Sequence, residues 1–282
     1  MITANNIWGR KFKDRLMTAL LAAATALVLL PLGMIFFHIV RMGIGSMSLD
    51  FFIHIPRPTG EAGGGMANGM VGSFVLIAIA SLIGLPIGIL GAIYLADYGG
   101  GRMSTVIRFS ADVLAGIPSI ITGMVVYALL VVPLHGFSAL AGAVALALIM
   151  IPIVLRTTEE QLKMVPITLR EASLALGVPL WRTSLKVTLR SAMTGVMTGI
   201  LLAIARIAGE TAPLLFTALG NQFWSRKLTD PIAALPLQIF SFAIAPYEDW
   251  HKLAWGGALV LVVVMFGLSL AARYFGRSRQ KN

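Results

Sequence analysis

Long apolar segments with few charged side chains constrain the fold of this chain more than any other feature. A helix that crosses the hydrocarbon core of a bilayer needs about 20 mostly apolar residues. Segments of about this length recur along the sequence, at residues 16–40, 71–96, 113–132, 137–155, 191–219 and 253–274. Because backbone groups in lipid must be hydrogen-bonded within the chain, such segments fold as helices. The sequence therefore predicts an all-α, polytopic membrane protein with about six transmembrane helices.

The composition supports this class and excludes several others. The chain is 57% hydrophobic and 12% charged, with a mean hydropathy of +0.87, far from the values of a soluble domain. Its net charge of +10 lies in short basic clusters between apolar segments, which indicates contact with membrane lipid and not with nucleic acid. The absence of Cys excludes disulfides and thiolate metal sites, and the four His residues have no metal-ligand spacing. Since no nucleophile, base and orienting group occur together, we expect no catalytic residue, no metal site and no cofactor bound by this chain.

The distribution of Lys and Arg predicts which helix ends face the cytoplasm. Basic residues are abundant at 1–15 and 156–190 and sparse at 41–70 and 220–251. Cytoplasmic segments carry the excess of Lys and Arg. We therefore expect a cytoplasmic amino terminus (1–15), a first transmembrane helix (16–40), a flexible, glycine-rich periplasmic loop (41–70) and a domain (71–282) with five transmembrane helices and a cytoplasmic loop at 156–190. Six spans also place the carboxyl terminus in the cytoplasm.

The loop at 156–190 contains the pattern of a short helix with one small, apolar face. The side chains on that face recur at helical spacing: Leu169, Ala172, Ser173 and Leu176. Gly177 can adopt the left-handed conformation that ends a helix. The start is marked either by a capping box of Thr168 with Glu171 or by Pro166. On composition alone, however, the segment could equally be an ordinary cytoplasmic loop with a positive charge bias.

A second informative stretch lies inside the fifth apolar segment. Arg206 and Glu210 are four residues apart, hence on one helical face and able to form an ion pair. At about 1.5 Å per residue, Arg206 lies roughly 22 Å along the helix from Ser191, past the middle of a bilayer core about 30 Å thick. A charge at that depth costs about 2.5 to 3.5 kcal/mol and normally faces the protein interior or a water-filled path. The pair either locks two helices together or presents the Arg206 guanidinium to a passing oxyanion, with Glu210 limiting how tightly the anion is held.

The segment Glu171-Ala172-Ser173, followed after three residues by Gly177, resembles the EAA loop of binding-protein-dependent ABC importer permeases. In that family the loop forms a coupling helix that sits in a cleft of a cytoplasmic ATPase. The resemblance implies an ATPase contact made by Arg170, Glu171, Ala172, Ser173 and Gly177. Ser173 replaces a second alanine, and Arg190 stands where the family often has proline, so we expect the exit from the loop to differ.

Four further motifs occur in order along the chain: Tyr94-Leu-Ala-Asp97-Tyr98, Ala115-Gly-Ile-Pro-Ser119, Arg206-Ile-Ala-Gly-Glu210-Thr211-Ala-Pro-Leu-Leu215 and Leu235-Pro-Leu-Gln-Ile239. Together they are similar to motifs of the phosphate-specific (Pst) permease subunits, PstA more than its partner PstC. The resemblance covers nearly the whole chain, from the first span to the sixth.

The Pst resemblance implies the type I ABC importer permease fold in a bacterial plasma (inner) membrane. Inorganic phosphate would be the transported solute, with Arg206, Glu210 and Thr211 in its path. The implied partners are a PstC-like permease subunit, a PstB-like ATPase dimer and a PstS-like periplasmic phosphate-binding protein. ATP and Mg would be bound by the ATPase subunits, so this chain would not itself be an enzyme.

Three alternatives remain open. A permease for another oxyanion, such as sulfate or molybdate, would share the loop and the topology. A secondary transporter would show two related halves with broken helices, and this sequence shows no such repeat. A non-transporting membrane scaffold that senses the state of a transporter would tolerate the loss of Arg206.

Overall fold

The computed structural model describes residues 5–59, 61 and 63–277, and this part of the chain is helical apart from turns, loops and two isolated β-bridges. Residues 1–4 and 278–282, at the ends of the predicted terminal segments, lie outside it. Five segments of the described residues are long and apolar enough to cross a membrane. They include all or most of α1 (Asn5–Ile44), α3 (Ala67–Ile93), α6 (Ala139–Lys163), α9 (Leu189–Ala208) and α12 (Glu248–Arg277). A sixth candidate is the bent pair α4 (Arg102–Gly116) and α5 (Ser119–Val126). The predicted all-α fold with about six spans is confirmed.

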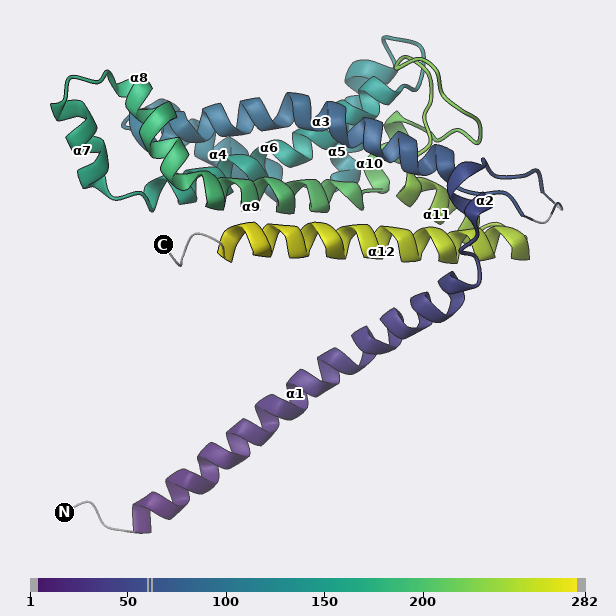
Figure 1. Cartoon of the computed structure of the whole chain (residues 1–282), viewed down its shortest axis with the longest axis horizontal. Helices are drawn as coiled ribbons and strands as arrows, with labels where there is room; N and C mark the ends of the chain where they lie inside the picture. The colour runs from purple at the N-terminus through teal and green to yellow at the C-terminus, as the bar shows by residue number, and fades with distance from the viewer. Residues whose placement is uncertain (1–4, 60, 62, 278–282) are drawn as a thin grey trace.

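Shorter elements connect the spans. The short α-helices are α2 (Leu49–Ile53), α7 (Ile167–Ala175), α8 (Leu180–Arg182), α10 (Ala212–Thr217) and α11 (Leu235–Ala243). Three π-helical stretches continue longer helices: η1 (Tyr94–Tyr98), η2 (Tyr127–Val131) and η3 (Thr183–Thr188). Helices α3, α6, α9 and α12 run side by side along the long axis of the molecule, with α7 across one end and α11 near the other (Figure 1).

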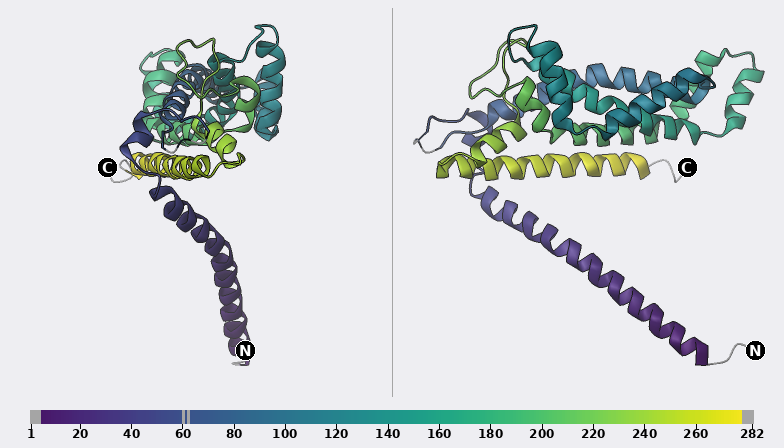
Figure 2. Two further views of the ribbon diagram at one scale, coloured as in Figure 1. Left: turned by 90° about the vertical axis from the view of Figure 1, so that its right-hand side faces the viewer. Right: turned by 180° about the vertical axis from the view of Figure 1, so that it is seen from behind.

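The helix α1 leaves this bundle at an angle, as all three views show (Figures 1 and 2). Only its carboxyl-terminal part packs on the bundle, where Gly43 approaches Leu259 and where the ring of His38 lies edge-on to Trp255 at 4.9 Å between centroids. None of its most apolar stretch is buried by this chain. The apolar side chains of α1 are therefore available to lipid or to another subunit.

The core of the bundle is the contact between α3 and α6. Three glycines on α3 face large side chains of α6: Gly84 opposite Met150, Gly88 opposite Val154 and Gly91 opposite Leu155. Small residues at such spacing let two membrane helices approach closely, where dispersion contacts replace the hydrophobic effect. The glycines of α3 allow this close approach, and Pro86 and Pro152 remain inside continuous helices.

Replacing Gly88 with Leu is expected to destabilise the protein by about 1–3 kcal/mol, the usual cost of overpacking a filled core. A Cβ added at Gly88 would lie 2.9 Å from two side-chain atoms of Val154 and 3.3 Å from the carbonyl oxygen of Ile151. The measurement is the thermal unfolding midpoint of the detergent-solubilised protein. Gly33→Leu is the matched control, because nothing lies within 4 Å of a Cβ at Gly33. Equal midpoints for the two variants would contradict the prediction.

The third span is longer than the apolar segment predicted at 113–132, and it is bent. It begins at Arg102, and its two halves meet at an angle of 105°. The bend falls at Ile117, which is extended, and Pro118, whose ψ of 134° is not helical. Proline cannot donate a backbone hydrogen bond, and the residue before it is pushed out of the helical region. Pro118 is therefore a true bend point, and the residues expected to form a loop before this span belong to α4.

The segment at 41–70 is more ordered than its glycine content suggests. It contains α2, whose start is capped by the hydroxyl of Ser48, which accepts a hydrogen bond from the amide of Phe51 at 3.2 Å. Phe51 and Met66 are fully buried, and both lie against the glycines at 256 and 257 of α12. The expected flexible loop is instead a folded cap on the end of the bundle opposite α7 (Figure 1).

Candidate functional site

The segment between α6 and α9 contains the short helix that the sequence predicts, α7. The loop on either side of this helix is shorter than predicted, because the two flanking spans extend into it. Helix α6 continues to Lys163, and the next spanning helix starts at Leu180 and runs through η3 into α9. The sequence-based spans ended at Leu155 and restarted at Ser191, because charged residues between them look like loop residues. In the structure, partners within the protein allow helical segments to carry these charges.

The end of α7 matches its prediction, and of the two predicted starts the structure has the one at Pro166. Gly177 has φ +77°, its amide donates to the carbonyl of Leu174 at 2.9 Å, and the amide of Val178 donates to that of Ser173 at 3.3 Å. These two bonds form the Schellman motif that ends many helices at a glycine. At the other end Pro166 is the N-cap and no side chain caps the helix, so the predicted capping box does not form.

The five predicted coupling residues separate into two groups. Glu171, Ala172 and Gly177 are exposed at the far end of the molecule. They lie among exposed apolar side chains, of which Leu176 is 84% accessible. Ser173 is buried and its hydroxyl lies 2.9 Å from that of Thr183, at the start of the spanning helix that leads into α9. The first group can contact another protein, whereas Ser173 holds α7 to its own bundle.

Arg170 belongs to the inward-facing group. Its guanidinium forms an ion pair with Asp97 in η1, and its Nη2 donates to the carbonyl oxygen of Leu162 at 2.5 Å. Its side chain is only 19% exposed and that of Asp97 only 3%. Sequence reasoning singled out the Tyr94–Tyr98 motif but assigned no role to Asp97, because the two partners are 73 residues apart.

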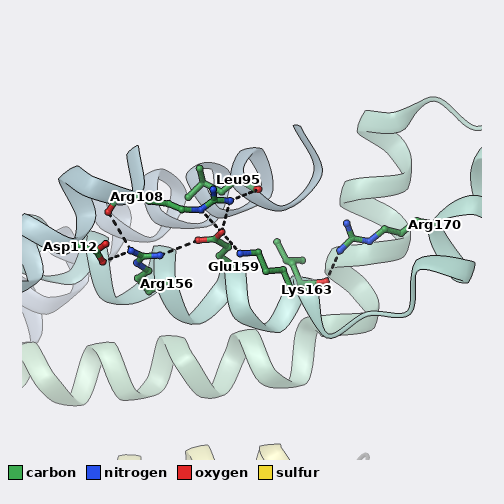
Figure 3. A network of polar contacts seen from close by, with 8 residues as sticks. Leu95, Arg108, Asp112, Arg156, Glu159, Lys163 and Arg170 are labelled. Carbon is green, nitrogen blue, oxygen red and sulfur yellow. Dashed lines mark hydrogen bonds and ion pairs between the residues drawn. The ribbon is translucent and has the colours of Figure 1, made fainter. Parts of the chain in front are cut away.

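A second charge cluster that sequence reasoning missed is centred on Glu159 of α6 (Figure 3). Its carboxylate is 2% exposed and lies 2.9 Å from Arg108 of α4, 2.6 Å from Lys163 and 3.7 Å from Arg156. Arg156 also pairs with Asp112 of α4. The spacing of Arg156, Glu159 and Lys163 on one helical face is a local signal for such a cluster, although their charge is also typical of a loop.

The predicted pair of Arg206 and Glu210 forms at a break between two helices. Arg206 lies in the last turn of α9, and Glu210 lies in the non-helical stretch before α10, where its Oε1 accepts from Nη1 of Arg206. Thr211 follows as the N-cap of α10 and makes no side-chain cap bond. The carboxylate is 6% exposed and the guanidinium side chain 56%. The pair therefore spans a break within one segment and does not lock two separate spans together.

This break lies near the middle of the bundle. A Cβ added at Gly209 would lie 3.7 Å from Cε of Met265, which is about halfway along α12. Pro213, at the start of α10, packs against Gly123 of α5. The predicted continuous span to Leu219 is wrong here, because Gly209 ends the helix. Non-helical backbone at membrane depth is tolerated only where protein or a water-filled cavity surrounds it.

The arrangement can bind an anion but shows no metal centre. The guanidinium of Arg206 is held by a buried carboxylate and open on its other side, so it offers fixed donors to a negatively charged ligand. Across the described residues, no three His, Asp or Glu side chains gather closely enough to hold a metal ion.

The chain is similar to known membrane transport proteins over most of its length. Residues 84–281 match the family model of the binding-protein-dependent transport system inner membrane component. It is 49% identical over 265 residues to the phosphate transport system permease protein PstA of Yersinia pestis, covering 94% of this chain and 90% of that protein. It is 45% identical over 273 residues to the protein of the same name from Pasteurella multocida, covering 96% and 97%.

Among solved structures, the chain superposes on a chain of a bacterial alginate ABC transporter crystallised with its alginate-bound periplasmic protein. The TM-score is 0.69 over 96% of both chains, at 13% sequence identity. So low an identity shows a shared fold and nothing more specific, and that fold is the type I ABC importer permease fold that the motifs predict. Fold, family model and relatives agree: the chain belongs to the binding-protein-dependent transport system inner membrane component family.

Proposed function

We propose that this chain is the permease subunit of an ATP-driven importer that carries inorganic phosphate across the inner membrane. The observation that carries the proposal is the half-exposed guanidinium of Arg206, held by the buried carboxylate of Glu210 at a helix break in mid-bundle. A fixed positive charge at that depth attracts an oxyanion, and the adjacent carboxylate keeps the anion from binding too tightly to leave. The hydroxyl of Thr211, the residue after Glu210, makes no side-chain cap bond and is a further donor.

The substrate assignment draws on the relatives. The proteins from Yersinia pestis and Pasteurella multocida are both named phosphate transport permeases, which favours phosphate over sulfate or molybdate. A non-transporting scaffold has no need of a charged pair in mid-bundle, whose burial costs free energy. The geometry and the names of the relatives therefore support the same function.

The ATP that drives transport would be hydrolysed by partner subunits and not by this chain. The exposed part of α7, with Glu171, Ala172 and Gly177, would sit in a cleft of a cytoplasmic ATPase dimer that binds ATP and Mg. Closure of the ATPases would then displace α7 and switch the bundle between inward-open and outward-open arrangements. A PstC-like permease would cover the exposed side of Arg206, and a PstS-like receptor would deliver phosphate at the opposite end, near the folded cap at 41–70.

In this proposed orientation both termini would lie in the cytoplasm. The cations Arg108, Arg156, Lys163 and Arg170 all gather at the α7 end of the bundle (Figure 3). An excess of Lys and Arg marks the cytoplasmic side of a membrane protein. The amino-terminal end of α1 and the carboxyl-terminal end of α12 point towards the same side (Figure 1).

The proposal is tested by uptake into proteoliposomes that hold this chain with its partner permease, the ATPase dimer and the receptor. We expect uptake of labelled phosphate that requires ATP and receptor and that excess unlabelled phosphate abolishes. Equal uptake of sulfate or molybdate would shift the assignment to another oxyanion. No uptake of any of the three anions by an assembled complex with an active ATPase would favour the scaffold.

A further inference from the structure

The contact between Asp97 and Arg170 joins two parts of the chain that the proposed cycle must move together. Asp97 lies in η1, the π-helical end of the α3 span, and Arg170 lies in the middle of α7. Among the described side chains it is the one ion pair that links α7 to the bundle. Two hydrogen bonds also link α7 to its surroundings, one from the Arg170 guanidinium to the carbonyl oxygen of Leu162 and a neutral one between the hydroxyls of Ser173 and Thr183. A displacement of α7 therefore acts directly on the end of α3.

Asp97 is buried and Arg170 is partly buried, and each has a polar atom without a partner. The carboxylate of Asp97 accepts from Nη1 of Arg170 through Oδ1, while its Oδ2 has no partner. Nε of Arg170 is likewise buried without a partner. A buried polar atom without a hydrogen bond costs free energy. The spare acceptor and the spare donor allow the pair to stay joined in a second arrangement of α7, in which other atoms of the two groups make the bond.

The end of α3 is also tied to the rest of the bundle. The carbonyl oxygen of Leu95, in the same π-helical turn, accepts from Nη2 of Arg108 at 3.2 Å. Arg108 in turn binds Glu159 of α6 (Figure 3). π-helical turns occur frequently at functional sites, because they break the regular helix hydrogen bonds. η1 is thus the point where α3, α4, α6 and α7 are linked by charged or polar groups.

We propose that Asp97 is a positioning residue that couples α7 to α3: its carboxylate holds Arg170 so that an ATPase-driven displacement of α7 moves the spanning helices. The inference rests on the proposed function, in which an ATPase binds the exposed part of α7. In this arrangement Arg170 transmits the displacement inwards, and the exposed residues Glu171 and Ala172 receive it. Loss of the carboxylate leaves ATP hydrolysis running without transport.

The test compares the wild type with Asp97→Asn in the reconstituted complex, measuring phosphate uptake and ATP hydrolysis together. Asn has nearly the same size as Asp and removes only the charge. We expect the phosphate transported per ATP hydrolysed to fall about tenfold, within the range for loss of one coupling contact between sites. Asp112→Asn is the matched control, because Asp112 pairs with Arg156 away from α7 and is 61% exposed. It should keep the wild-type ratio.

The exchanged pair Asp97→Arg with Arg170→Asp separates coupling from folding. Partial recovery of the transport ratio by the double variant supports the proposal, since it restores the pair with its charges reversed. An unchanged ratio in Asp97→Asn overturns it. Loss of complex assembly in Asp97→Asn that the exchange does not repair also overturns it, because the carboxylate would then serve folding. If the wild-type complex itself moves no phosphate, the proposed function fails instead.

Discussion

Replacing Arg206 with Gln is expected to reduce ATP-driven phosphate uptake by about ten- to a hundredfold, the effect of losing a charge-assisted hydrogen bond worth about 1.5–3 kcal/mol. The substitution keeps a hydrogen-bonding side chain and removes the positive charge that faces the open side of the helix break. Complex assembly has to be checked alongside, because the proposed partner permease covers the exposed side of Arg206. The measurement is uptake in proteoliposomes with the assembled complex confirmed by co-purification.

Two further variants determine why uptake is lost. Arg190→Gln is the matched control on the same helix, because Arg190 is exposed and no ion pair is found for it among the described residues. It should leave uptake unchanged. The double variant Arg206→Gln with Glu210→Gln removes both charges. If this double variant recovers wild-type uptake, then Arg206 serves only to neutralise Glu210 and its proposed place in the anion path is wrong.

Replacing Glu159 with Gln is expected to lower the free energy of unfolding by about 3 kcal/mol, the low end of the cost of breaking a buried ion pair. The carboxylate is 2% exposed, and its loss leaves Arg108 and Lys163 without their anionic partner. Arg156 retains Asp112, and the three cations are partly exposed, which places the effect at the low end. The expected result is a lower thermal midpoint of the solubilised protein.

The matched control for this variant is Glu160→Gln on the same helix. Glu160 is exposed, and no hydrogen bond or ion pair is found for its side chain in the described part of the chain. Surface charges of this kind contribute about 0–1 kcal/mol, so the midpoint should hardly move. If Glu159→Gln has the same midpoint as Glu160→Gln, then the cluster does not stabilise the junction of α4 and α6.

The sequence by itself determined the features that depend on neighbouring residues. The apolar segments predicted the class and the approximate number of spans, because the length of an apolar run sets whether a helix can cross lipid. The helix stop at Gly177 followed from the freedom of glycine at positive φ. The pair of Arg206 with Glu210 followed from their spacing of four residues.

Only the tertiary structure decided where the spans end and which charges meet. Charged residues are poor markers of a span's end when distant residues pair with them, as Arg108 does with Glu159 across 51 positions. The same applies to Asp97 and Arg170, whose ion pair joins α7 to the end of α3 across 73 positions. Each of these features depends on contacts between segments far apart in the chain, and local spacing carries no information about such contacts.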